Sequence, residues 1–191
     1  PANLRGQFSN RISKYVHDPI GAAVLALEDP ATGAQAVLVG CDLVAVPGTV
    51  QDRICRAVAD RIPDFDTDML VMNATHTHTA PVIEEGIYPP DDPPVITPTE
   101  YQDFFVAQIA DAVVAAWQGR TPGGISWALG HAVVGHNRRA SYADGSSKMY
   151  GDTAREDFEC IEGYEDHSLD LLFTWDDAGA LTGMVANLAC P

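Results

Sequence analysis

Apolar runs separated by turn-forming residues mark the first predicted strands of the chain. Residues 22–28 and 35–42 are rich in Ala, Val and Leu, which predicts two strands. Between them, residues 29–33 read Asp-Pro-Ala-Thr-Gly, so we expect an antiparallel hairpin. A third apolar run at residues 69–72 predicts a buried strand.

Apolar residues recur at helical spacing after this hairpin. Thr49 is a suitable N-cap for a first helix, with Asp52 three residues further on, and Pro63 is expected to end it. The apolar stripe of this helix consists of Val50, Ile54, Val58 and Ile62.

A second helix has clear start and end signals. Thr97 is expected to cap it, with Pro98 at the first helical position and Glu100 completing a capping box. Gly119 is expected to end it. The predicted buried face consists of Tyr101, Phe105, Ile109, Ala112 and Ala116.

The order strand, helix, strand predicts a right-handed parallel crossover between residues 35–42 and 69–72. The fold is therefore expected to be α/β: a mixed sheet with helices packed on it and at least one parallel βαβ unit. Further on, we predict a short strand at 125–129 and a hairpin over 169–175 and 181–189. Because the last strand reaches the end of the sequence, residues 1–191 are expected to form one incomplete domain.

Composition narrows the function classes. The 191 residues are 46% hydrophobic, which is typical of a globular protein, and no apolar run is long enough for a transmembrane segment. The net charge of −16 argues against nucleic acid as a partner, since phosphate binding needs a basic surface. The first residues lack the features of a signal peptide. If a signal peptide has been removed, a soluble secreted or periplasmic protein is compatible with the sequence.

The main candidate chemistry is the pair His76 and His78, which directly follows the third strand. Residues two apart on a strand project from the same face, so we expect the two imidazoles to point together. Such a pair suits zinc, whose catalytic sites usually have three protein ligands and a water. Structural histidines at the end of a strand are the alternative. Three other histidines are isolated in the sequence: His17, His131 and His167.

Asp42 is expected at the same carboxyl-end edge of the sheet as His76, where open α/β sheets place their ligands. It could orient a histidine ring, or it could cap the turn that follows its strand. A third metal ligand could come from Asp42, His136, His167 or the acidic loop that follows the pair. That loop, residues 82–97, is rich in proline and forms either a wall of the site or a surface excursion.

A second cluster, His136-Asn-Arg-Arg139, follows a strand-like run at residues 132–134. A guanidinium can present several donors to a carbonyl oxygen or a developing oxyanion. The alternative is an ordinary ion pair with one of the 27 acidic residues. The rest of the segment to residue 165 is polar, and we place no strand in it.

Residues 74–81, Ala-Thr-His-Thr-His-Thr-Ala-Pro, resemble the Thr-His-Thr-His-Ser-Gly-Pro signature of neutral (non-lysosomal) ceramidases. The run Cys41-Asp42-Leu43 resembles the family's strand that carries an aspartate ahead of a helix. Asn137-Arg138 is similar to its Asn-Arg step, and residues 183–191 look like the strand before its next metal ligand. The resemblance covers nearly the whole chain, as the N-terminal portion of the catalytic domain of a remote branch.

The resemblance implies a zinc-dependent amidase that cleaves the N-acyl bond of ceramide. For a remote branch we expect another amide or ester as the substrate, such as a small-molecule or lipid-like amide. His76 would then be a zinc ligand, His78 would assist proton transfer or hold the tetrahedral intermediate, and Arg138 would stabilise that intermediate. Where the family has its second zinc histidine, this chain has Cys190-Pro191. The remaining ligands, a glutamate and a tyrosine, are implied to lie outside this sequence, in the remainder of the catalytic domain. The competing hypothesis is a non-catalytic domain that keeps the scaffold and binds a ligand or partner.

Overall fold

The computed structural model describes residues 1–89 and 95–189. The chain divides into two compact units, Pro1–Arg120 and Thr121–Pro191, which we describe separately. The expectation of one domain over residues 1–191 stays a prediction.

Unit 1 contains a mixed three-stranded sheet in the order β1-β2-β3. Strands β1 (Ala22–Asp29) and β2 (Ala34–Cys41) form the predicted antiparallel hairpin. Strand β3 (Leu70–Ala74) pairs parallel with β2, so that Cys41 lies opposite Ala74 at the end of both strands. With helix α1 (Gly48–Ala59) between β2 and β3, this confirms the parallel βαβ unit.

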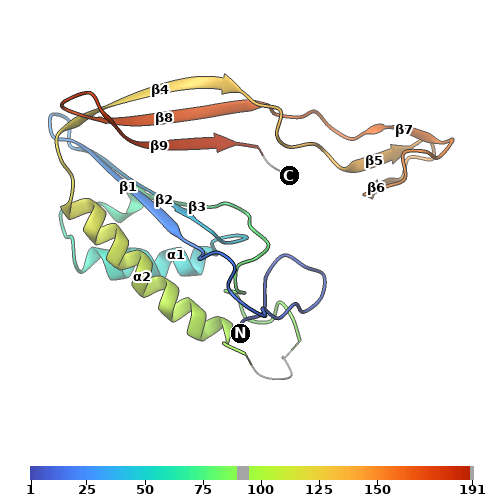
Figure 1. Ribbon diagram of the computed structural model, residues 1–191, viewed down its shortest axis with the longest axis horizontal. Helices are drawn as coiled ribbons and strands as arrows, with labels where there is room; N and C mark the ends of the chain where they lie inside the picture. Colours follow the sequence, from blue (N-terminus) through green and yellow to red (C-terminus); the bar gives the residue numbers. More distant parts are fainter. Residues whose placement is uncertain (90–94, 190–191) are drawn as a thin grey trace. The chain divides into compact units, whose positions relative to one another are not determined.

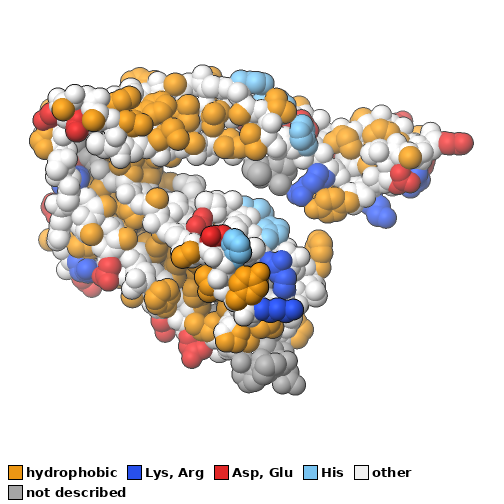
Figure 2. Space-filling model, in the orientation of Figure 1, with side chains coloured by type: hydrophobic (Ala, Val, Ile, Leu, Met, Phe, Trp, Pro, Cys, Tyr) orange, Lys and Arg blue, Asp and Glu red, His pale blue; other side chains and the backbone are white. Residues whose placement is uncertain are grey.

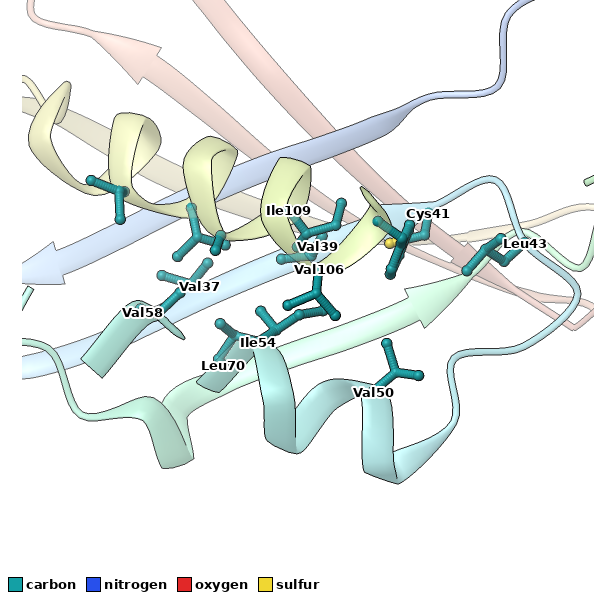
Figure 3. Packing of buried hydrophobic residues seen from close by; sticks show 14 of the residues in the cluster. Val37, Val39, Cys41, Leu43, Val50, Ile54, Val58, Leu70, Val106 and Ile109 are labelled. Carbon is teal, nitrogen blue, oxygen red and sulfur yellow. The ribbon is translucent and has the colours of Figure 1, made fainter. Parts of the chain in front are cut away.

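Both helices of unit 1 cover the same face of this sheet (Figure 1). Their apolar stripes meet the buried side of β2, and Val39, Ile54 and Ile109 come from the strand and the two helices (Figure 3). Val39 and Ile54 have no exposed surface, so the core is closed at this point. Burial of these apolar side chains holds β2, and with it the start of the Asp42 segment, in a fixed position.

Helix α1 (Gly48–Ala59) begins and ends earlier than predicted. Thr49 is not its N-cap: Pro47 occupies that position and makes no side-chain capping bond. The carbonyl of Pro47 instead accepts the first backbone bonds, from Val50 and Gln51, so the first turn starts before the threonine. The predicted stripe of α1 is nevertheless buried.

Helix α2 (Pro98–Gln118) confirms the predicted boundaries. The Thr97 side chain accepts a bond from the Glu100 backbone N–H, and the Glu100 carboxylate accepts one from the Thr97 N–H. This reciprocal bonding satisfies two donors that the first turn would leave without partners. Gly119 is the C-cap.

Unit 2 contains two antiparallel three-stranded sheets. The first has the order β4-β8-β9, formed by β4 (Gly123–His131), β8 (Ser168–Asp176) and β9 (Leu181–Leu188). Its last two strands are the predicted C-terminal hairpin, and β4 is longer than the predicted strand at 125–129.

The second sheet of unit 2 has the order β6-β5-β7. It consists of β5 (Arg139–Tyr142), β6 (Ser147–Met149) and β7 (Phe158–Ile161), in the polar segment where we predicted no strand. Its buried anchors are Ala140 and Tyr142, too few to give an apolar run in the sequence.

The mixed sheet and its two helices confirm the predicted α/β fold class. A short 3-10 helix, η1 (Thr67–Met69), leads into β3. Among residues 1–89 and 95–189, no helix has the length and apolar character needed to cross a membrane.

Candidate functional site

The His76–His78 pair lies just beyond the carboxyl end of β3. Because Cys41 and Ala74 are paired, Asp42 and Thr75 leave the sheet side by side, as the sequence predicted. Thr75 donates its backbone N–H to the carbonyl of Cys41 at 2.9 Å, which keeps the two chains together beyond the strands. The edge predicted for the site is therefore the edge where the histidines lie.

The ring of His76 is fixed by the backbone of the segment after β2. Its Nδ1 lies 2.8 Å from the carbonyl oxygen of Val44. A carbonyl oxygen only accepts, so Nδ1 carries the hydrogen and the neutral ring keeps a lone pair on Nε2. Metal-binding histidines commonly use one ring nitrogen for a carbonyl in this way and present the other to the metal. The hydrogen bond to Val44 therefore leaves Nε2 of His76 without this partner, and the role of His76 as a metal ligand stays a prediction.

The rings of His76 and His78 lie with their centroids 5.0 Å apart and their planes at 70°. We predicted that the alternation of side chains along a strand would bring the two rings together. That explanation is wrong, because β3 ends at Ala74, before either histidine. His76 instead has φ 62°, a left-handed conformation that is uncommon for residues other than glycine. The turn at His76 brings the rings together, and both side chains are exposed.

The N-terminal segment contacts His78 through Gly6 and Arg11. A Cβ added to Gly6 would lie 2.4 Å from Cγ of the His78 ring, so only a glycine allows this approach. The Arg11 guanidinium donates a hydrogen bond to the carbonyl oxygen of His78. Backbone bonds from Arg5 to Ala80 and from Val82 to Asn3 hold the two segments together.

Substitution of Gly6 by alanine should displace His78. The φ of +102° would strain any L residue by about 1–3 kcal/mol, and the new methyl group would overlap the imidazole. The matched control is Gly33→Ala, which has φ +74° with no atom within 4 Å of its Cβ position. Both variants should lower the unfolding midpoint, but only Gly6→Ala should shift the His78 imidazole signals in an NMR spectrum. Equal spectra for the two variants would contradict the contact.

Asp42 contacts the histidine segment through Thr75. Its carboxylate accepts a bond from the Thr75 hydroxyl at 3.1 Å and one from the Gly21 backbone N–H at 3.0 Å. The His76 ring instead donates its hydrogen bond to the carbonyl oxygen of Val44. The orienting role of Asp42 stays a prediction, and the contact that would transmit it is the one to the residue immediately before His76.

We expect Asp42→Asn to weaken metal binding about 10–100-fold, the range for partners of metal ligands. The amide cannot accept both bonds, since one of its two polar atoms is a donor. Asp29→Asn is the matched control, because Asp29 accepts its bonds from Ala31 and Thr32 within its own turn. Competition with a chromophoric chelator measures the affinity. An unchanged affinity would leave Asp42 with only its role in the turn.

Arg138 belongs to unit 2 and lies just before β5. Its guanidinium donates to the Tyr150 hydroxyl at 2.8 Å and lies over the ring of that tyrosine, 5.1 Å from the centroid. The neighbouring Arg139 pairs with Glu162 at 2.7 Å. The alternative of an ordinary ion pair thus applies to Arg139, whereas Arg138 contacts the uncharged phenol of Tyr150.

Two histidines outside the pair, His136 and His167, lie beside the Glu165 carboxylate in unit 2, and a third, His131, lies against the ring of His167. Glu165 lies 3.2 Å from Nδ1 of His136 and 3.4 Å from Nε2 of His167, and the ring centroid of His131 is 5.4 Å from that of His167. A bond from the Asn137 backbone N–H, together with His136, lowers the pKa of Glu165. We had taken His131 and His167 as isolated. β4 pairs with β8 and places His131 opposite Ser168, next to His167. A prediction of this strand pairing would have brought the two histidines together.

No group of three His, Cys, Asp or Glu side chains within residues 1–89 and 95–189 is arranged to hold a metal ion. His76 has the ring orientation of a metal ligand, but the described part of the chain does not complete a site around it. Cys190-Pro191, where the resemblance places the next ligand, lie outside the described residues, as do residues 90–94 of the proline-rich loop.

Comparison with known proteins shows which solved structures share this fold. No family model and no curated protein matches the sequence. A solved structure of neutral ceramidase from Pseudomonas aeruginosa matches with a TM-score of 0.58 and 18% identity over 86% of this chain. A structure described as ceramidase complexed with C2 matches with a TM-score of 0.57, at the same identity and coverage. The chain has a neutral-ceramidase-like fold.

The ceramidase-like fold agrees with the fold that the resemblance of residues 74–81 implied, and membership of the family stays a prediction. The chain spans 25% of the length of each ceramidase that it matches. At 18% identity, the likeness concerns the fold.

Proposed function

We propose that this chain is part of a metal-dependent hydrolase that cleaves an N-acyl amide bond with a zinc-activated water. The observation that carries the proposal is the bond from His76 to Val44, which leaves Nε2 of His76 available beside the His78 ring. The ceramidase-like fold supports a lipid-like amide as the substrate class. The remaining ligands are proposed to come from the remainder of the catalytic domain.

The residues of this chain have distinct proposed roles. His76 would hold zinc through Nε2, and a bound zinc would polarise the amide carbonyl and lower the pKa of its water. His78, exposed and 5.0 Å from His76 between ring centroids, would transfer a proton or hold the developing oxyanion. For Arg138, whose guanidinium keeps donors beyond the one bonded to Tyr150, the proposed role is stabilisation of negative charge.

A non-catalytic binding domain is the second candidate. It is favoured by one observation: the described residues do not assemble three metal-ligating side chains. Such a domain would keep the β2-α1-β3 scaffold and use the same sheet edge to bind a ligand without turnover.

Metal removal distinguishes the two candidates. We expect the intact protein to contain zinc by elemental analysis and to lose hydrolysis of a fluorogenic N-acyl amide after treatment with o-phenanthroline. Added zinc should restore the activity, and the non-chelating isomer m-phenanthroline is the matched control. Intact protein that contains no metal and hydrolyses no amide would support the binding domain instead.

A further inference from the structure

The first 16 residues form a loop. Backbone hydrogen bonds join its two ends, and Tyr88 is hydrogen-bonded to its middle. Residues 2–4 lie antiparallel to residues 11–13: the Leu4 N–H donates to Arg11 at 2.9 Å and the Ser13 N–H donates to Ala2 at 2.8 Å. The Gln7 N–H donates to the Tyr88 hydroxyl at 3.1 Å, and that hydroxyl donates to the Gln7 carbonyl at 2.5 Å. We call residues 5–16 the N-terminal loop.

Large apolar side chains of this loop face solvent, although its backbone is fixed by the hydrogen bonds described above. Phe8, next to the bonded Gln7, is 105% exposed, and Tyr15 and Val16 are 75% and 79% exposed. An exposed phenylalanine side chain forfeits the favourable free energy of its burial. Neighbouring exposed apolar residues of this kind mark an interaction surface.

The charge of the loop is opposite to that of the chain. Arg5, Arg11 and Lys14 are basic and the loop has no acidic residue, whereas the whole chain has a net charge of −16. Hydrophobic and basic side chains lie together over this part of unit 1, beside histidine side chains (Figure 2). Aromatic residues combined with Lys and Arg suit the interface of an anionic lipid bilayer.

We propose that the N-terminal loop binds the surface of an anionic lipid bilayer, with Phe8 and Tyr15 entering the interface and Lys14 and Arg11 near the headgroups. The proposal rests on the proposed function, because a lipid-like amide is found in such a surface. Gly6, in the same loop, lies against the His78 ring, so binding would bring the bilayer next to the histidine pair.

Vesicle flotation with the intact protein tests the proposal. On phosphatidylcholine vesicles that contain phosphatidylserine, Phe8→Ala should reduce binding roughly tenfold, and Lys14→Gln about fivefold. Omission of phosphatidylserine or addition of salt should remove the contribution of Lys14. The matched controls are Phe104→Ala on α2, whose side chain is 59% exposed, and Lys148→Gln on β6. Neither control should change binding.

Failure of this proposal can be told apart from failure of the proposed function. A water-soluble short-chain N-acyl amide should be hydrolysed equally by wild type and Phe8→Ala, since Phe8 is no part of the proposed catalytic residues. If that hydrolysis is present but wild-type protein does not float with vesicles, or Phe8→Ala floats like wild type, the loop serves another purpose, such as contact with another part of the protein. If vesicles are bound through Phe8 but no amide is cleaved, the hydrolase proposal fails and the surface stands.

Discussion

Replacement of His76 is expected to abolish both metal binding and amide hydrolysis. The ring is the side chain of the pair whose tautomer is fixed, through the Val44 carbonyl, with Nε2 left to bind a metal. Loss of a direct ligand should exceed the roughly 10–100-fold effect of partners of metal ligands, so zinc should be absent from the purified variant. Elemental analysis and an amide hydrolysis assay on the intact protein measure the two effects.

The choice of variant matters because His76 has φ 62°. Asparagine tolerates this left-handed conformation better than alanine, so His76→Asn removes the imidazole with little backbone strain. His17→Ala, at an exposed histidine paired with Asp18, is the matched control and should keep metal and activity. A His76→Asn variant with full zinc content and full activity would rule out the hydrolase proposal.

Replacement of His78 by glutamine should reduce kcat by about 10²–10⁴-fold, the range for loss of a general acid or base, while zinc content stays that of wild type. The bond from Arg11 goes to the backbone carbonyl of His78, which the substitution keeps, so the local fold should survive. The metal is proposed to be held by the neighbouring ring.

The pH profile separates this role from a structural one. If His78 transfers a proton, the His78→Gln variant should lose one limb of the pH dependence of kcat/KM. If the ring only packs on Gly6, the unfolding temperature should fall while kcat and the shape of the pH profile stay unchanged. That second result would leave His78 outside the chemistry.

Much of the fold around the site could be predicted from the sequence because the signals are local. The capping box of Thr97 and Glu100 depends on residues three apart, and the apolar runs that become β2 and β3 are continuous. The order of these elements then places Asp42 and the histidine segment at one edge of the sheet.

The geometry of the site could not be predicted because it depends on contacts between distant segments and on one backbone angle. Gly6 contacts the ring of His78, which lies 72 positions further along the chain. The ring of His76 is oriented by a backbone carbonyl, that of Val44, so no side chain in that segment signals the contact. Strand alternation gave the correct neighbours for the wrong reason, since the left-handed turn at His76 brings the rings together. Similarly, His131 and His167 are 36 positions apart in the chain and meet because β4 pairs with β8.

The contact of Gly6 with the His78 ring joins the N-terminal loop to the histidine pair. Gly6, Val44 and both histidines belong to unit 1, and their contacts are within that unit. The contacts of the pair with Gly6, Arg11 and Val44 therefore form when unit 1 folds. If His76 holds the proposed zinc, this first ligand would be oriented by contacts of unit 1, whatever supplies the other ligands.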